Sequence, residues 1–205
     1  MTQQYIKVCR SKRAFSNELF IYGSAYPDKA DLIEVRKPYT LVLSKIKGVP
    51  YLNVPDFSDD MVIKLANAIS KFHSLVQVEG KVLCHWDNQP RNILWNEKKK
   101  RFFLVDFEDI RIAYPESDIA HLFLFWAEVM NYEDFVRKTE VFLLQYKKTI
   151  KPNPDNWKNE LRKAKNRFDK RRRMYNKQES VSNLYRNLNR SYLLISEFIE
   201  EKINP

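Results

Sequence analysis

Three side chains that carry oxygen ligands, Asp87, Asn92 and Asp106, lie in one stretch of the chain, each near a short apolar run. A carboxylate can orient an attacking hydroxyl and accept its proton. A carboxamide and a second carboxylate supply the oxygen ligands that Mg²⁺ prefers. The three residue types therefore suit the transfer of a phosphoryl group to a hydroxyl.

The elements that must position these side chains are apolar runs at residues 82–84, 93–95 and 102–105. Short apolar runs bounded by turn residues are typical of buried strands. The loop between the first two runs carries Asp87 and Asn92, and Asp106 directly follows the third run. The polar residues between the second and third runs predict a hairpin turn, so one hairpin can bring the three side chains to the same end.

The spacing also matches a known catalytic loop, in which His-x-Asp is followed by an Asn five residues after the Asp and later by Asp-Phe. This chain reads HWDNQPRN at 85–92, VDFE at 105–108 and YPESDIA at 114–120. Together with the helix-like segment at 65–75, these motifs resemble the aminoglycoside phosphotransferase and choline kinase branch of the protein-kinase-like fold. The resemblance covers roughly residues 5–130.

The resemblance implies an α+β, bilobal protein-kinase-like fold and a phosphotransferase that uses ATP or GTP. Asp87 would be the catalytic base, and Asn92 and Asp106 would hold Mg²⁺. On a predicted strand at 5–8, Lys7 would bind the nucleotide phosphates and pair with Glu18. The alternative for this pair, a surface lysine and a glutamate at a helix start, stays open at this point.

The resemblance also predicts a division of the chain into an N-lobe and a mainly helical C-lobe. Ile46 and Lys47 fall in the segment joining the lobes, whose backbone would hold the nucleotide base. Only six residues precede Lys7 and the chain has three glycines, so we expect a minimal N-lobe that lacks the Gly-rich loop of kinases. The predicted ranges are 1–47 for the N-lobe, 44–48 for the hinge, 48–205 for the C-lobe, 85–92 for the catalytic loop, 106–108 for the metal site and 155–205 for a basic helical region.

Two side chains at the site have more than one interpretation. Trp86 stands where the family usually has Gly, and it could narrow the acceptor pocket, stack on a substrate or simply pack into the loop. Glu108 could be a further metal ligand, although a charged residue at a strand end is the interpretation we prefer.

Other patterns predict the remaining elements. Apolar residues at helical spacing indicate helices, and the helix at 118–130 should be buried because it is apolar on nearly all sides. The resemblance implies that Asp118, at the start of this helix, stabilises the catalytic loop. We expect His73 to be a packed structural residue. The predicted strands are 32–35 and 39–43, an apolar segment begins at Ser16, and the predicted helices are 61–75, 118–130, 132–146, 157–177 and 181–203.

Composition and length limit the class of protein. The chain has 205 residues, of which 44% are hydrophobic and 14% aromatic, enough to build a core and too apolar for a disordered chain. It contains no apolar run long enough for a transmembrane helix and no recognisable signal peptide, so we expect a cytoplasmic protein. Cys9 and Cys84 follow no metal-ligand spacing, and we expect two buried free thiols.

The net charge of +10 is concentrated in one segment. Residues 158–177 contain ten Lys and Arg and two Asp and Glu, which accounts for eight of the ten net charges. A solvated helix face is the usual reason for such a run, but it could also attract an anionic partner or acceptor. Nucleic acid is not excluded, although no nucleic-acid-binding motif is present.

Three functions fit these observations. The first is a kinase that transfers the γ-phosphate of ATP or GTP to a hydroxyl of a small, sugar-, aminoglycoside- or choline-like and possibly anionic acceptor. The second is a kinase-like scaffold with little activity, favoured by the expected lack of a Gly-rich loop. The third is a small atypical protein kinase, which the basic segment favours and the motif at 114–120 disfavours.

Overall fold

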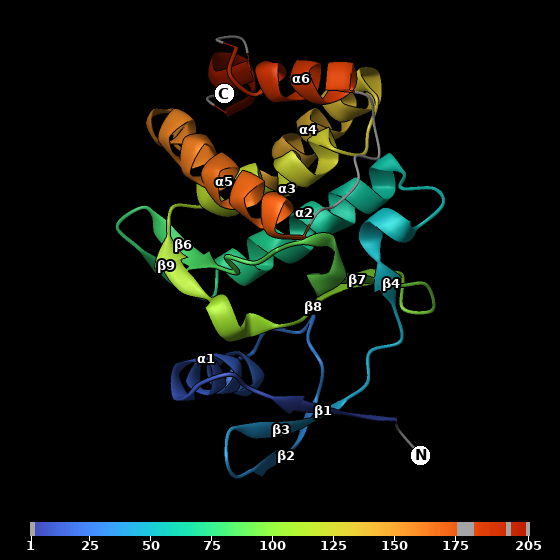
Figure 1. The fold of residues 1–205 in the computed structure, drawn as a ribbon, viewed down its shortest axis with the longest axis vertical. Helices are drawn as coiled ribbons and strands as arrows, with labels where there is room; N and C mark the ends of the chain where they lie inside the picture. The colour runs from blue at the N-terminus through green and yellow to red at the C-terminus, as the bar shows by residue number, and fades with distance from the viewer. Residues whose placement is uncertain (1–2, 176–182, 196–197, 204–205) are drawn as a thin grey trace. The chain divides into compact units, whose positions relative to one another are not determined.

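The chain forms two compact units in a computed structural model that describes residues 3–175, 183–195 and 198–203. The first unit combines Met1–Phe57 with His85–Arg111, and the second combines Ser58–Cys84 with Ile112–Pro205. Figure 1 shows the path of the chain. The catalytic-loop hairpin thus belongs to the same unit as the N-terminal strands, while the predicted lobe boundary at 44–48 stays a prediction.

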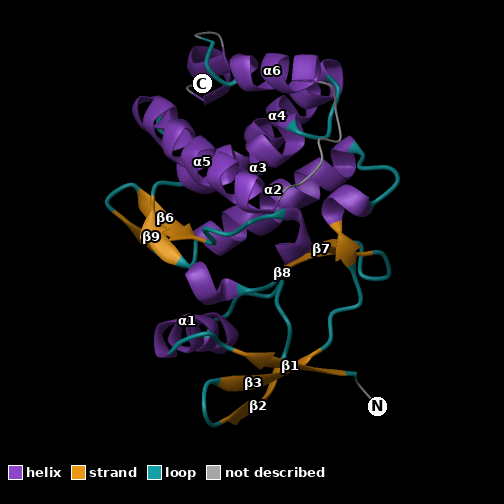
Figure 2. Cartoon of the chain, viewed as in Figure 1, coloured by secondary structure: helices purple, strands orange, loops and turns teal. Residues whose placement is uncertain are grey.

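The first unit contains one helix and two small antiparallel sheets (Figure 2). The strand orders are β1-β3-β2 and β4-β7-β8. The elements are β1 (Gln4–Val8), α1 (Lys12–Gly23), β2 (Leu32–Arg36), β3 (Thr40–Ser44), β4 (Val49–Pro50), β7 (Ile93–Asn96) and β8 (Arg101–Leu104), with short 3-10 turns η1 (Tyr51–Asn53), η2 (Pro90–Asn92) and η3 (Phe107–Asp109).

The predicted hairpin is confirmed. β7 and β8 pair antiparallel, with Ile93 opposite Leu104, and the Val105 amide donates to the carbonyl of Asn92 at 3.0 Å. Three of the four side chains in each strand are buried, as expected for short apolar strands covered on both faces. This pairing places Asn92 and Asp106 just beyond the same end of the hairpin.

Helix α1 begins earlier than the sequence pattern suggested. Its N-cap is Ser11, whose hydroxyl accepts from the amide of Ala14 at 3.1 Å, a bond that satisfies one of the free amides at a helix start. The expected start at Ser16 was therefore wrong by about one turn, because the cap outweighs the weakly apolar first turn. The helix buries Glu18 and Ile21.

Gly48 allows β4 to pair with β7. A Cβ at this position would lie 2.8 Å from the carbonyl oxygen of Trp95, which is closer than real Cβ atoms approach a backbone oxygen. Val49 pairs with Trp95 directly after this close contact. The glycine therefore fixes how the segment after β3 reaches the hairpin.

The second unit is mostly helical, with an aromatic core. Trp126 and Phe142 lie 5.8 Å apart between ring centroids, and Trp157 and Phe198 lie 5.4 Å apart. A third sheet has the strand order β5-β6-β9. The elements are α2 (Asp59–His73), β5 (Gln77–Val78), β6 (Lys81–Cys84), β9 (Arg111–Ala113), α3 (Glu116–Ala127), α4 (Tyr132–Tyr146), α5 (Pro154–Tyr175), α6 (Asn183–Tyr192) and a π-helical turn η4 (Phe198–Ile203).

His73 is the packed structural residue that the sequence suggested. Its ring is fully buried, with Nδ1 2.6 Å from the Tyr146 hydroxyl and Nε2 3.1 Å from the Asp118 carboxylate. Both cysteines are free and buried, as expected. Within the ranges given above, no helix is long and apolar enough to span a bilayer.

The predicted packed helix at 181–203 was right only in part: Tyr192, Leu193 and Phe198 are buried as expected, while residues 181–182 and 196–197 lie outside the described part. The helical segment ends at Tyr192, and its Leu184 and Leu188 side chains are 65% and 42% exposed. Asn189 is buried instead, where its amide donates to the carbonyls of Ala127 and Met130 at 3.3 and 2.9 Å. The polar side of α6 packs inward because it satisfies carbonyl groups at the end of α3.

Candidate active site

Lys7 is the centre of an acidic cluster in the first unit. Its Nζ lies 2.6 Å from Asp106 Oδ1 and 3.0 Å from Glu18 Oε1. Glu108 Oε1 lies at 3.7 Å. The strand lysine and the helix glutamate therefore form the pair that the resemblance implied, and the interpretation of Lys7 as a surface residue is wrong, because its side chain is only 11% exposed.

Burial and charge act on this pair in opposite directions. Burial alone lowers the pKa of Lys7, but the carboxylates of Glu18 and Asp106 outweigh it and raise the pKa above its ordinary value. Burial raises the pKa of Glu18 to about 7, against the attraction of the Lys7 ammonium. The lysine thus stays charged at neutral pH, while its buried partner titrates near neutrality.

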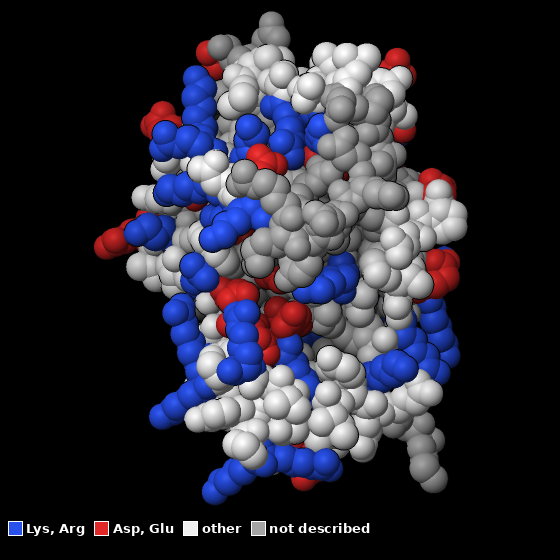
Figure 3. Space-filling model, viewed as in Figure 1, with Lys and Arg blue, Asp and Glu red and all other residues white. Residues whose placement is uncertain are grey.

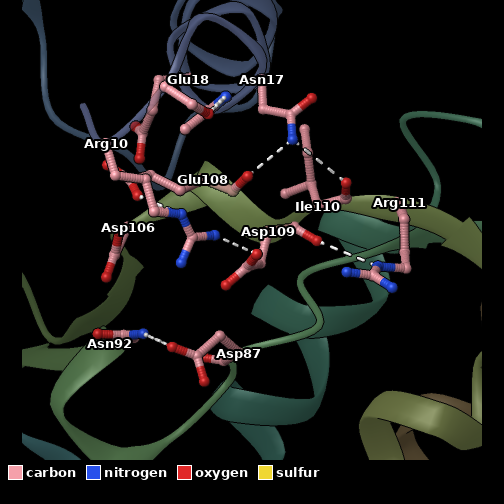
Figure 4. Close-up of polar contacts among 12 residues, drawn as sticks. Arg10, Asn17, Glu18, Asp87, Asn92, Asp106, Glu108, Asp109, Ile110 and Arg111 are labelled. Carbon is pink, nitrogen blue, oxygen red and sulfur yellow. Dashed lines mark hydrogen bonds and ion pairs between the residues drawn. The ribbon is translucent and has the colours of Figure 1, made fainter.

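Arg10 supplies a second cation to the cluster, which motif reasoning did not identify. Its Nε lies 3.2 Å from Glu108 Oε2, and a terminal nitrogen pairs with Asp109 (Figure 4). The two acidic residues that Arg10 contacts lie two and three residues after Asp106, and this position in the sequence was the available signal. Glu108 thereby belongs to the charged cluster and is more than a strand-end residue.

Asp87 is fixed within its own loop. Its Oδ2 accepts from Gln89 Nε2 at 2.8 Å and from Asn92 Nδ2 at 3.2 Å. The same Asn92 nitrogen donates to the Asp87 carbonyl at 2.8 Å. The loop turn η2 therefore brings the predicted base and one predicted metal ligand into direct contact, and Gln89 is a further positioning residue that the motif did not reveal.

The segment that carries Asp106 is held from two sides. Asp106 adopts a left-handed backbone conformation with φ 67°, a conformation uncommon for residues other than Gly, Asn and Asp. From α1, Asn17 Nδ2 donates to the Glu108 carbonyl at 2.8 Å. His85 Nε2 lies 3.0 Å from the Val105 carbonyl oxygen. These contacts set the direction of the Asp106 carboxylate.

A pocket of about 320 Å³ opens beside these groups, within the first unit. The predicted residues Lys7, Ile46, Asn92 and Asp106 line it, with apolar side chains from several strands completing the wall. Lys47 is not among the lining residues, and its carbonyl accepts from Asn96 Nδ2 at 2.6 Å. The full lining is Tyr5, Lys7, Tyr22, Ala30, Leu43, Ser44, Lys45, Ile46, Arg91, Asn92, Leu94, Val105 and Asp106.

The residues present fit a divalent cation. Because Asn92 uses its amide nitrogen for Asp87, its carbonyl oxygen is the atom left for a metal, and Figure 4 shows this residue next to Asp106. Carboxylate oxygens of Glu18, Asp106 and Glu108 also lie within 4.8 Å of one another. Such an all-oxygen donor set suits Mg²⁺ better than a transition metal.

A second pocket, of about 520 Å³, lies in the second unit between α5 and α6. Its basic lining residues are Lys158, Arg162, Lys165 and Arg190, over leucine side chains, and Figure 3 shows basic side chains gathered over α5. Arg190 is paired with Glu128 at 2.7 Å. Of the predicted basic segment, Lys177 and the side chains of residues 171–173 fall outside the described part.

Solved structures with similar folds are kinases. An aminoglycoside phosphotransferase from Streptomyces rimosus, solved with ADP and streptomycin, has a TM-score of 0.62 at 14% identity, covering 77% of this chain and 84% of that one. Amicoumacin kinase hAmiN, solved in complex with AMP-PNP, Ca²⁺ and Ami, has a TM-score of 0.62 at 12% identity, covering 98% of this chain and 82% of that one. An ethanolamine kinase of Plasmodium vivax has a TM-score of 0.56 at 12% identity, covering 73% of this chain and 62% of that one.

These likenesses confirm the predicted protein-kinase-like fold. No curated protein sequence matches the chain significantly. The model of one family, choline/ethanolamine kinase, matches residues 28–199, most of the chain. The motifs that suggested the aminoglycoside phosphotransferase and choline kinase branch, the fold and this match agree, and the chain belongs to the choline/ethanolamine kinase family.

Proposed function

We propose that this protein transfers the γ-phosphate of ATP or GTP to a hydroxyl of a small-molecule acceptor. One observation carries the proposal: Asp87 is held by Asn92, and Asn92 lines the same pocket as Asp106 and Lys7. A base, oxygen ligands for a metal and a phosphate-binding cation are therefore available at one site. Family membership supports a small-molecule phosphotransferase.

The proposed reaction assigns one task to each residue. Asp87 orients the acceptor hydroxyl and receives its proton as the acceptor oxygen bonds to the γ-phosphorus. The bond from that phosphorus to the bridging oxygen breaks, and a nucleoside diphosphate leaves. Lys7, oriented by Glu18, holds the phosphates of the co-substrate. A magnesium ion on Asn92 and Asp106 would offset the negative charge of the phosphates.

The nucleotide base would occupy the apolar end of the first pocket. Leu43, Leu94 and Val105 line this part, and they provide the flat apolar walls on which a purine packs. Ile46 is the hinge residue that we propose to contact the base. Lys47 was also predicted here, and we propose that it acts by holding the hinge in place, because its carbonyl binds Asn96.

Nucleotide binding measured by calorimetry tests this proposal. Wild type, Asp106→Ala and a control, Asp56→Ala, are titrated with ATP and with GTP, each with and without Mg²⁺. Asp56 is exposed in the first unit and lies outside the pocket. We expect Mg²⁺-dependent binding by wild type and the control, and its loss in Asp106→Ala.

The same titration separates the second candidate function. Absence of binding to either nucleotide would reject the kinase proposal and favour a kinase-like scaffold. A binding partner would then be sought at the pocket between α5 and α6, whose exposed basic residues Lys158, Arg162 and Lys165 favour an anionic partner.

A further inference from the structure

Helix α6 presents apolar side chains to solvent. Leu184 and Leu188 are exposed and lie four residues apart, which places them on one side of the helix. Leu194, just beyond the helix end, is 55% exposed. A surface helix normally buries its apolar side, but here Asn189 is the buried residue. Single exposed leucines are common, whereas several on one element mark a contact with a protein or a membrane.

A row of basic side chains runs along the neighbouring helix α5. Lys158, Arg162 and Lys165, which we call the basic row, follow one another at spacings of four and three residues, so they lie on one side of that helix. All three are exposed and line the pocket of about 520 Å³ between α5 and α6. Figure 3 shows basic side chains gathered over α5. This pocket is therefore open to a partner that carries negative charge.

The exposed leucines border the same pocket. Leu194 lines it, and so does Asn187 of α6. Leu184 lies about one helical turn before Asn187, and Leu188 directly follows it. The basic row and the exposed apolar side chains are therefore adjacent parts of one surface.

The charges of the basic row are not compensated. Another cation of the pocket, Arg190, lies 2.7 Å from Glu128 and 3.1 Å from Asp169, so those two carboxylates are already paired. Within the part of the chain that the structure describes, no carboxylate pairs with the basic row. The row thus offers three positive charges to a partner outside the chain.

Charge and hydrophobicity together decide which partner fits this surface. A second copy of the chain, related by a two-fold axis, would bring one basic row against another, and the like charges would repel. A nucleic acid would pair with the row through its phosphates but would leave the leucines in contact with water. An anionic membrane surface fits both features, because its phosphate groups attract the cations and its acyl boundary accepts apolar side chains.

We propose that the surface around the pocket between α5 and α6 docks on an anionic membrane. The basic row binds the phosphate groups of the lipids, and Leu184, Leu188 and Leu194 enter the boundary between headgroups and acyl chains. The pocket, of about 520 Å³, is large enough for one phospholipid headgroup. All of these residues belong to the second unit, and none of them takes part in the proposed reaction.

Cosedimentation of the full chain with lipid vesicles tests the inference. One set of vesicles is made of phosphatidylcholine alone, and the other contains about one third phosphatidylserine. We expect binding to the anionic vesicles to be at least about tenfold tighter and to weaken as the salt concentration rises, because salt screens the contacts with phosphate. Calorimetry with glycerol phosphate shows whether a soluble phosphate compound binds without a lipid surface.

A pair of double variants tests the contribution of the basic row. Lys158→Gln with Lys165→Gln should weaken binding to the anionic vesicles at least about tenfold, because each basic side chain near such a surface adds to the attraction. The control, Lys148→Gln with Lys151→Gln, removes two exposed charges elsewhere in the second unit and should weaken binding less than about threefold.

A pair of single variants tests the apolar contact. Leu194→Ser should weaken binding to the anionic vesicles about fivefold, because a leucine side chain no longer leaves water when the protein docks. The control, Leu144→Ser, changes a leucine of α4 that is 71% exposed and should keep the affinity of wild type.

Three results would overturn the inference. The first is a wild type that binds the anionic vesicles no better than the neutral ones. The second is an affinity for the anionic vesicles that stays unchanged in the Lys158 and Lys165 variant or in Leu194→Ser. The third is calorimetric binding of glycerol phosphate by a wild type that binds no vesicles, which would assign the pocket to a soluble anion. Loss of nucleotide binding would reject the proposed function and leave this inference standing.

Discussion

The Lys7 ammonium lies closer to Asp106, at 2.6 Å, than to Glu18, at 3.0 Å. The proposed phosphate-binding lysine is therefore paired with the proposed metal ligand. A divalent cation at Asp106 would compete with this contact, because both need the same carboxylate. Binding of a metal–nucleotide complex should transfer Lys7 from Asp106 to the phosphates while Glu18 keeps its orientation.

Removal of Lys7 should strengthen the binding of a divalent cation in the absence of nucleotide. In wild type, the carboxylates of Glu18, Asp106 and Glu108 share the Lys7 ammonium. The change Lys7→Met removes this positive charge, so the carboxylates should attract a divalent cation more strongly. We expect Mn²⁺ to bind about tenfold more tightly, as measured by electron paramagnetic resonance. Lys12→Met, an exposed change on α1, is the control. Equal Mn²⁺ affinity in wild type and Lys7→Met would show that Lys7 does not occupy the metal position.

Gln89 should influence the chemical step and leave nucleotide binding unchanged. Its amide donates to Asp87 Oδ2 at 2.8 Å, so Gln89→Ala frees the carboxylate to rotate. We expect kcat to fall roughly tenfold, because small errors in the position of a catalytic group are costly, with an unchanged Kd for nucleotide. Gln77→Ala, at an exposed position in β5, is the control. A Gln89→Ala enzyme with normal kcat would reject the positioning role.

Glu116 should make the stability of the protein depend on pH. Burial raises its pKa to about 7, and the negative charge of Glu160 adds to the effect. Since the folded-state pKa lies above the unfolded value, the stabilising contribution is complete below about pH 4.5 and is lost as the pH rises through 7. At one pKa unit per 1.36 kcal/mol, the loss is at most about 3 kcal/mol.

Urea unfolding at pH 5 and pH 8 measures this effect. Gln can still accept the hydrogen bond that Glu116 receives from the Asn153 amide, so Glu116→Gln should be more stable than wild type at pH 8 and similar at pH 5. The control is Glu133→Gln, an exposed residue at the start of α4. A variant with the same pH dependence as wild type would exclude Glu116 as the source.

Asn189 should stabilise the second unit through its buried amide. Asn189→Ala leaves the carbonyls of Ala127 and Met130 without this donor, and we expect a loss of about 1–3 kcal/mol in the free energy of unfolding. Asn187→Ala, at an exposed position on the same helix, should change it by less than about 0.5 kcal/mol. Equal effects of the two changes would contradict the observed orientation of α6.

The basic pocket between α5 and α6 should bind polyanions. Lys158→Gln with Lys165→Gln removes two of its charges, while Lys148→Gln with Lys151→Gln removes two exposed charges elsewhere in the second unit. On a heparin column, the first variant should elute at lower salt than the second, because retention depends on local charge density. Identical elution of the two variants would show that net charge alone determines retention.

The sequence by itself determined the features that depend on neighbours along the chain. The loop at 85–92 and the strand end at Asp106 belong to one hairpin, so their spacing was enough to predict that Asn92 and Asp106 meet. Helix α4 was predicted with its observed bounds because its apolar residues recur at helical spacing. The residues of a short segment determine local structure of this kind. The motifs that indicated the family also lie within short segments, so the sequence was enough to find them.

Only the tertiary structure decided which side chains far apart in sequence meet. Lys7 and Asp106 are 99 residues apart, and so are Arg10 and Asp109, so no local pattern could pair them. Leu184 was expected to be buried but is exposed, because α6 turns Asn189 toward the core instead. The Asn189 amide donates there to the carbonyl of Met130, which is distant in sequence. Hydrogen bonds and ion pairs in a folded chain depend on which segments approach each other, and that approach is a property of the whole fold.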